Sequence, residues 1–128
     1  MREIKFRCWD KKERRMERVI SLFWDDFGKI TLVLLEGYDE PHHIDDVELL
    51  QFIGRRDRNG EELYKGDLIR DGGNRILEVF WNEFVNGWWF AEYRADGVYH
   101  VEGIDLTSIE KVGNIFENRN LLGVTPDA

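Results

Sequence analysis

Residues 50–69, LQFIGRRDRNGEELYKGDLI, hold a short apolar run, a turn and a second sharp bend, and this order decides the fold. Leu49 to Ile53 predicts a strand that Gly54 closes, and Asn59-Gly60 predicts a tight turn because both residues accept a positive φ. At Gly66-Asp67 the glycine permits a sharp bend, and the aspartate accepts hydrogen bonds from nearby amides. We therefore expect structural roles for Gly54, Asn59, Gly60, Gly66 and Asp67.

The same alternation of short apolar segments and turns continues toward the C-terminus. It predicts strands at residues 68–70, 75–81, 88–94 and 98–101. Five or six short strands in about 65 residues fit a small antiparallel barrel or sandwich, and the bend at Gly66 resembles the entry to an SH3-like barrel. Residues 106–112 are compatible with a short helix or a strand. Asn118 is expected to cap a helical turn that Gly123 ends.

Residues 1–48 predict a β-hairpin region. Ile4, Phe6 and Cys8 alternate with charged residues, which predicts an opening strand with one buried face. Strands at residues 16–24 and 30–35 are expected to pair as a hairpin.

Residues 36–48 carry six acids and no Lys or Arg, and they predict an exposed acidic loop. The expected architecture is mainly β with minor α, in one compact unit. An N-terminal hairpin region over residues 1–48 packs against an SH3-like barrel over residues 49–128.

The composition limits the classes of function. The 128 residues carry 18 Lys and Arg against 26 Asp and Glu, a formal net charge of -8 that argues against general binding to nucleic-acid phosphates. The single cysteine, Cys8, has no partner for an internal disulfide, which fits a reducing cytoplasm. The charged N-terminus and the short longest apolar run, residues 32–35, predict neither a signal peptide nor a membrane span.

The charge is unevenly distributed, which supports a second hypothesis. Residues 1–20 carry eight cations against four anions, and Phe6, Trp9 and Met16 lie between them. A basic segment with interleaved aromatics is typical of a nucleic-acid interface, at which Lys11, Lys12, Arg14 and Arg15 would be the first residues to test. The four anions and the alternation along a strand favour a solvated face instead. In a related hypothesis, the acidic residues 36–48 compete with nucleic acid for a host nucleic-acid-binding protein.

Enzyme signatures are missing from the sequence. It contains no glycine-rich phosphate loop, no hydrolase signature and no cysteine with a catalytic partner, so we expect no catalytic, cofactor or metal site. A third hypothesis is a carboxylate-metal hydrolase that uses some of Asp10, Asp25, Asp26, Asp45 and Asp46. His42-His43 next to acids suggests a metal site, although adjacent side chains in an extended loop rarely reach one ion.

An aromatic cluster marks the second half of the chain. Six large aromatic residues occupy eleven positions: Phe80, Trp81, Phe84, Trp88, Trp89 and Phe90. In a strand, Trp88 and Trp89 would point to opposite faces. One face is expected to be core, and the other is either covered by the N-terminal half or presented to a partner. Trp88, Trp89 and Phe84 are therefore the candidate interaction surface.

Three stretches in order resemble the YopX family, small proteins encoded mainly by bacteriophages and prophages of Gram-positive bacteria. They are residues 1–10 (MREIKFRCWD), residues 50–69, and residues 109–118 (IEKVGNIFEN) followed by Leu121-Leu122. The chain departs from the family pattern at Arg119, where proline is frequent. The resemblance implies a genomic setting and supplies no established activity, substrate or catalytic residue. The leading hypothesis is a non-catalytic phage or prophage accessory protein that acts by protein contacts or self-association.

Overall fold

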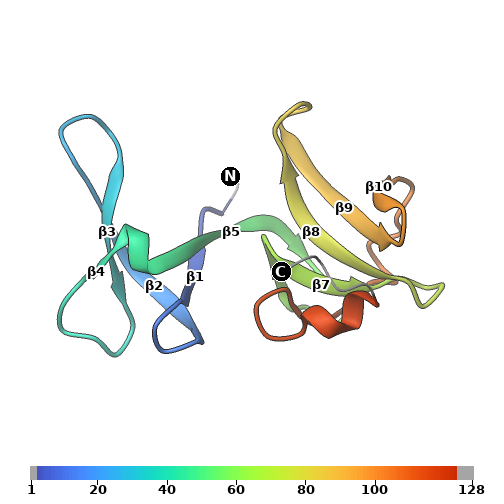
Figure 1. Cartoon of the computed structure of the whole chain (residues 1–128), viewed down its shortest axis with the longest axis horizontal. Helices are drawn as coiled ribbons and strands as arrows, with labels where there is room; N and C mark the ends of the chain where they lie inside the picture. The colour runs from blue at the N-terminus through green and yellow to red at the C-terminus, as the bar shows by residue number, and fades with distance from the viewer. Residues whose placement is uncertain (1–2, 124–128) are drawn as a thin grey trace. The chain divides into compact units, whose positions relative to one another are not determined.

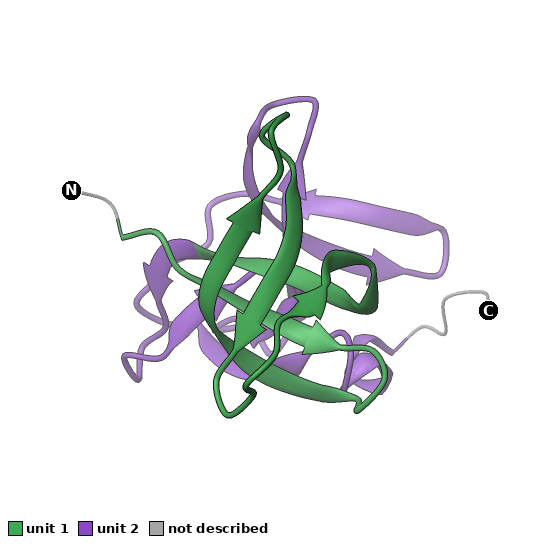
Figure 2. Cartoon of the chain, turned by 90° about the vertical axis from the view of Figure 1, so that its left-hand side faces the viewer, with its two compact units in different colours: residues 1–52 green, residues 53–128 purple. Residues whose placement is uncertain are grey.

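A computed structural model describes residues 3–123 and shows a mainly β chain, as predicted. Met1 and Arg2, which begin the first family stretch, lie outside the described residues. The chain divides into two compact units, residues 1–52 and residues 53–128, coloured separately in Figure 2. The expected boundary after residue 48 falls inside strand β5 (Val47–Arg56). Two antiparallel sheets carry the fold, a six-stranded one and a five-stranded one.

The six-stranded sheet has the order β4-β3-β2-β1-β5-β6. Its opening strands come from the alternating segments that the sequence predicted, and β1 pairs with both β2 and β5. The register places Cys8 opposite Glu17 on one side and Leu49 on the other. Besides β5, the strands are β1 (Phe6–Asp10), β2 (Arg15–Trp24), β3 (Ile30–Leu35), β4 (His42–His43) and β6 (Glu62–Tyr64).

The core of unit 1 contains Cys8, Val33, Leu35 and Val47. Val47 belongs to the segment expected to be an exposed acidic loop, and that expectation is wrong in part. Residues 42–47 form β4, the 3₁₀ turn η1 (Ile44–Asp46) and the start of β5, and β4 pairs with β3. The apolar side chains interspersed among the acids pack on the core, and this burial outweighs the loop-like composition.

We expect Cys8 to be unreactive in the native protein. Burial, followed by the charges of Asp10 and Glu17, raises the pKa of the Cys8 thiol to about 12. Because the thiolate is the reacting species, alkylation by iodoacetamide at pH 8 should be at least about a thousandfold slower than for free cysteine. Mass spectrometry in increasing urea would report when unit 1 opens. Native labelling at the rate of a free thiol would contradict the buried position.

The five-stranded sheet of unit 2 has the order β10-β9-β8-β7-β11 (Figure 1). Among the described residues neither sheet closes into a barrel by hydrogen bonding: β4 and β6 are the unpaired edges of the first sheet, and β10 and β11 are those of the second. The SH3-like arrangement stays a prediction. The elements are β7 (Asp67–Arg70), β8 (Ile76–Asn82), β9 (Gly87–Arg94), β10 (Gly97–Val101), β11 (Glu110–Asn114) and the 3₁₀ turn η2 (Arg119–Leu122).

The turn at residues 57–61 is held by a side chain. Asp57 accepts hydrogen bonds from the amides of Asn59 (2.8 Å), Glu61 (2.9 Å) and, 54 residues further on, Lys111 (2.8 Å). Of the predicted Asn59-Gly60 pair, only Gly60 has a positive φ, 81°. The Asp57 carboxylate holds the turn through these hydrogen bonds. The turn therefore differs from the two-residue hairpin turn in which both central residues have a positive φ. Gly54 lies within β5.

The second bend ties four segments of unit 2 together. Asp67 is fully buried and accepts from the Tyr64 amide at 2.7 Å, and Lys111 Nζ lies 3.3 Å from its Oδ2 atom. The Gly66 amide donates to the Val79 carbonyl, and the Gly66 carbonyl accepts from the Ile115 amide. Gly66 has a φ of 87°, which few other residues adopt. The bend therefore connects β6, β7, β8 and the segment after β11.

The C-terminal turn differs from the prediction at its start. η2 and its left-handed C-cap Gly123 are present, but the Asn118 side chain makes no capping hydrogen bond. Asn118 Oδ1 instead accepts from the Asn114 amide at 3.2 Å. Of residues 106–112, for which helix and strand were both open, residues 110–112 belong to β11 and residues 106–109 form turn and coil.

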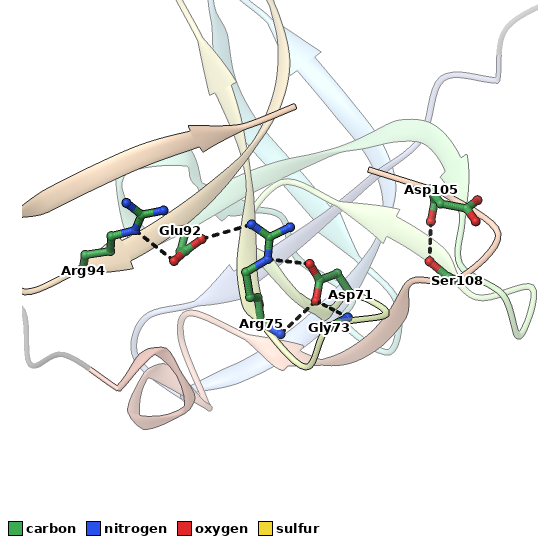
Figure 3. A network of polar contacts seen from close by, with 7 residues as sticks. All are labelled: Asp71, Gly73, Arg75, Glu92, Arg94, Asp105 and Ser108. Carbon is green, nitrogen blue, oxygen red and sulfur yellow. Dashed lines mark hydrogen bonds and ion pairs between the residues drawn. The ribbon is translucent and has the colours of Figure 1, made fainter. Parts of the chain in front are cut away.

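A chain of ion pairs lies where β7 turns into β8 (Figure 3). Asp71 accepts from the Gly73 and Arg75 amides and pairs with Arg75 Nε at 2.7 Å. Arg75 also contacts Glu92 at 3.4 Å, and Glu92 pairs with Arg94 at 3.0 Å. Exposed pairs of this kind contribute little singly. Of these three pairs, the one between Arg75 and Glu92 joins the β7–β8 turn to β9.

Candidate interaction surface

The β8–β9 hairpin carries most of the aromatic cluster. Its register pairs Trp81 with Trp88, and Phe80 with Trp89. Paired residues share a face of the sheet, and neighbours along a strand alternate. Trp81 and Trp88 therefore lie on one face, and Phe80 and Trp89 on the other.

The face that carries Trp88 is continuous with the core of unit 2. Trp88 and Phe90 pack against that core, which contains Ile53, Leu63, Ile69, Leu77, Val79, Val101 and Ile109. The Trp88 ring meets Trp81 edge to face, with ring centroids 5.0 Å apart. Trp88 Nε1 is buried, and no hydrogen-bond acceptor within residues 3–123 reaches it. Trp88 therefore contacts both the core of unit 2 and the ring of Trp81.

The turn of the hairpin presents apolar side chains. Asn82 Oδ1 accepts from the amides of Phe84 and Val85, and Asn86 has a φ of 56°. The exposed fractions are 100% for Phe84, 54% for Val85 and 36% for Trp81. We call Trp81, Phe84 and Val85 the hairpin-tip surface; the hairpin turn that bears Phe84 and Val85 projects beyond the rest of unit 2 in Figure 1. Neighbouring exposed apolar groups of this size are typical of contact sites.

The opposite face of the hairpin holds Trp89 in a different environment. Its ring lies 3.3 Å from that of His100 and 6.3 Å from that of Phe80, centroid to centroid. Tyr93 donates a hydrogen bond to Glu78 beside them. Burial raises the pKa of the Glu78 carboxyl, and burial together with this hydrogen bond raises that of Tyr93.

The three residues expected to form one surface are therefore divided. Phe84 belongs to the hairpin-tip surface. Trp88 contacts the Trp81 ring of that surface, and Trp89 lies on the other face of the sheet. Sequence reasoning missed Trp81 and Val85 as members of this surface. Trp81 could have been found as the cross-strand partner of Trp88, once the turn at residues 83–86 set the register.

Comparison with known proteins finds a matching family and similar structures. The family model described as YopX protein matches residues 5–123. The chain belongs to the YopX family. Protein EF1440 from Enterococcus faecalis is similar in structure, with a TM-score of 0.62 and 20% identity over 95% of this chain and 99% of that one. Protein yopX from Bacillus subtilis follows with a TM-score of 0.58 and 18% identity over 94% and 98%. No curated protein matches significantly.

The acids of the hydrolase hypothesis are not all brought together in this YopX chain. Asp10 precedes β2 and Asp25-Asp26 follow it, so the ten residues of β2 place them roughly 30 Å apart. Asp25 instead accepts from the Phe27 and Lys29 amides within its own turn. Within residues 3–123, no group of three or more His, Cys, Asp or Glu is placed to hold a metal ion.

Several cations of the basic segment have partners inside unit 1. Lys11 Nζ lies 3.1 Å from the Asp45 carbonyl and 3.7 Å from a Glu48 oxygen. Arg15 donates to Glu17 and to the Tyr38 hydroxyl. These contacts reduce the charge left for phosphate groups. In the described part of this YopX chain, no helix is long and apolar enough to cross a membrane.

Proposed function

We propose that this YopX-family protein acts through protein contacts, first of all with a second copy of itself, at the hairpin-tip surface. In this proposal it is a non-catalytic accessory protein of a phage or prophage and works in the cytoplasm of the bacterial host. The observation that carries the contact is the complete exposure of Phe84 beside Trp81 and Val85. Aromatic residues at the centre of an interface supply most of its binding energy.

The charge of the chain makes the proposal testable by salt. Two copies that each carry a net charge of -8 repel one another at low ionic strength. Salt screens this repulsion and leaves the apolar contact intact, so self-association should strengthen as salt rises. Binding to nucleic acid, the alternative, should weaken steeply with salt because counterions are released.

Light scattering coupled to size-exclusion chromatography tests the surface. We expect the wild type to show a concentration-dependent oligomer that grows with salt. Phe84→Ser should weaken self-association about tenfold or more, because it removes an aromatic anchor. Phe27→Ser is the matched control, since Phe27 is 88% exposed in the β2–β3 turn of unit 1.

Two outcomes would overturn the proposal. One is a strict monomer at every salt concentration, and the other is an equal effect of Phe27→Ser. Short DNA added in a further run separates the alternative. A complex that forms only at low salt would direct attention to Lys12 and Arg14, both exposed in the turn after β1.

A further inference from the structure

Within residues 3–123 the two sheets end in four edge strands, β4 and β6 in one sheet and β10 and β11 in the other. The backbone of an edge strand can pair with a further strand, and proteins protect such edges by shortness, charge or a bulge. β4 has two residues and β6 has three. β11 contains Glu110 and Lys111, and its register shifts between Lys111 and Gly113. Three of these four edges are therefore protected.

β10 has none of these protections. Its five residues, GVYHV, include no Lys, Arg, Asp, Glu or Pro, and its pairing with β9 runs without a register shift. Val98 is 58% exposed, and Tyr99 beside it is also exposed. β10 is therefore an open edge that carries exposed apolar side chains.

The turn between β9 and β10 fixes which backbone groups face outward. Two residues separate the paired residues Arg94 and Gly97. In a two-residue hairpin the pair that flanks the turn is hydrogen-bonded, and hydrogen-bonded pairs then alternate along the ladder. Val98 and His100 therefore direct their backbone amide and carbonyl groups away from β9. Within residues 3–123, no hydrogen bond from outside the β9 pairing reaches these groups.

Carboxylates lie at both ends of this open edge. Asp96 precedes β10, and Glu102 follows it with a side chain that is 86% exposed. Asp96 accepts a hydrogen bond from the Tyr99 hydroxyl at 2.8 Å, and a Glu102 oxygen lies 3.8 Å from His100 Nε2. In the described part of the chain neither carboxylate forms an ion pair with a Lys or Arg. The ends of the edge are therefore negatively charged.

These two carboxylates disfavour a second copy of β10 as the strand that pairs here. In an antiparallel pairing that sets Val98 of one copy opposite His100 of the other, Asp96 faces Glu102 at both ends. Like charges directly opposite one another destabilise a strand pair. The charge of Asp96 also acts on Arg94, but that guanidinium already pairs with Glu92 at 3.0 Å. The edge instead favours a strand that carries a cation at each end.

We propose that β10 binds an extended segment of another protein, which joins the five-stranded sheet as a further strand. The segment has uncharged residues of high strand propensity at its centre and a Lys or Arg at each end, opposite Asp96 and Glu102. Its backbone pairs with Val98 and His100, and its cations balance the two carboxylates. This edge is separate from the hairpin-tip surface, because β10 pairs with residues 90–94 of β9 and the hairpin turn lies at the other end of that strand.

Hydrogen exchange followed by NMR tests the edge with a seven-residue peptide that has lysine at both ends and alternating threonine and valine between them. We expect millimolar peptide to slow exchange of the Val98 and His100 amides about threefold or more, because both amides then donate to the peptide. The control peptide carries N-methyl groups on its two valines, which are placed to pair with Val98 and His100. It should bind about tenfold more weakly, because the methyl groups remove the donors.

Charge reversal at Glu102 tests the electrostatic part of the proposal. Glu102→Lys should weaken binding of the lysine-ended peptide severalfold and strengthen binding of the same peptide with glutamate at both ends. Glu83→Lys is the matched control, because it makes the same change in net charge at an exposed position in the turn at the other end of β9. Both side chains are exposed, so both variants are expected to fold. An equal loss in the two variants would overturn the assignment of cations to the ends of the segment.

The remaining outcomes separate strand pairing from other forms of association. Unchanged exchange of Val98 and His100 at millimolar peptide would contradict the proposal. Equal binding by the N-methylated peptide would also contradict it, because association would then occur without strand pairing. Protection of these amides that rises with protein concentration alone would assign the edge to a second copy. Phe84→Ser should leave peptide binding unchanged, so a failure of self-association at the hairpin tip would not affect this result.

Discussion

Replacing Asp57 by alanine is expected to lower the free energy of unfolding by about 3 kcal/mol, because three backbone amides lose their acceptor. Asp57 is buried, and the amides belong to Asn59, Glu61 and Lys111. The Lys111 contact joins the turn after β5 to β11, so its loss loosens two segments at once. Urea denaturation followed by tryptophan fluorescence measures the change. An effect no larger than that of Asp105→Ala, at an exposed turn with a single amide donor, would contradict it.

The same carboxylate makes stability depend on pH. Burial opposes its ionisation, but the three amides and the charge of Lys111 outweigh burial and hold the pKa of Asp57 below its usual range. The stabilisation that the ionised Asp57 carboxylate gives the folded state is therefore complete above about pH 4. It is lost as the pH falls through the lower pKa that Asp57 has in the folded state. Asp57→Asn should flatten the acid limb of a stability curve measured between neutral pH and about pH 2. An unchanged limb would assign the acid dependence to other carboxylates.

The second large effect is expected at Gly113. A Cβ atom added there would lie closer than 3.0 Å to three side-chain atoms of Asn118. Asn118 is held by its own amide, which donates to the Asn114 carbonyl, and by the Asn114 amide. Gly113→Ala should therefore cost about 3 kcal/mol through overpacking of this turn.

A double variant separates the clash from a general loss of order. Gly113→Ala combined with Asn118→Gly removes the obstructing side chain and should recover part of the lost stability, although the Asn114 amide then lacks its acceptor. Chemical denaturation of the wild type, both single variants and the double variant gives the coupling between the two positions. Additive effects would mean that the two side chains do not compete for the same space.

Local patterns predicted most strands because alternation and turn chemistry lie within a few residues. The strands at β1 to β3 and β7 to β10 follow from them, as does the left-handed Gly123. β11 was undecided between helix and strand, because its choice depends on Asp57 and β7, which are distant in sequence. The candidate surface was found in part for the same reason: exposure of Phe84 follows from the turn, but the pairing of Trp81 with Trp88 requires the register.

By itself, the sequence determined the mainly β class, the turns at residues 57–61 and 66–67, and membership of the YopX family through three ordered stretches. Only the tertiary structure decided what the acidic segment does. Ile44 and Val47 pack on the core of unit 1, and this brings His42 beside Asp10, 32 positions earlier in the chain. The physical reason is that composition reports the average preference of a segment, whereas burial of a few apolar side chains sets its path.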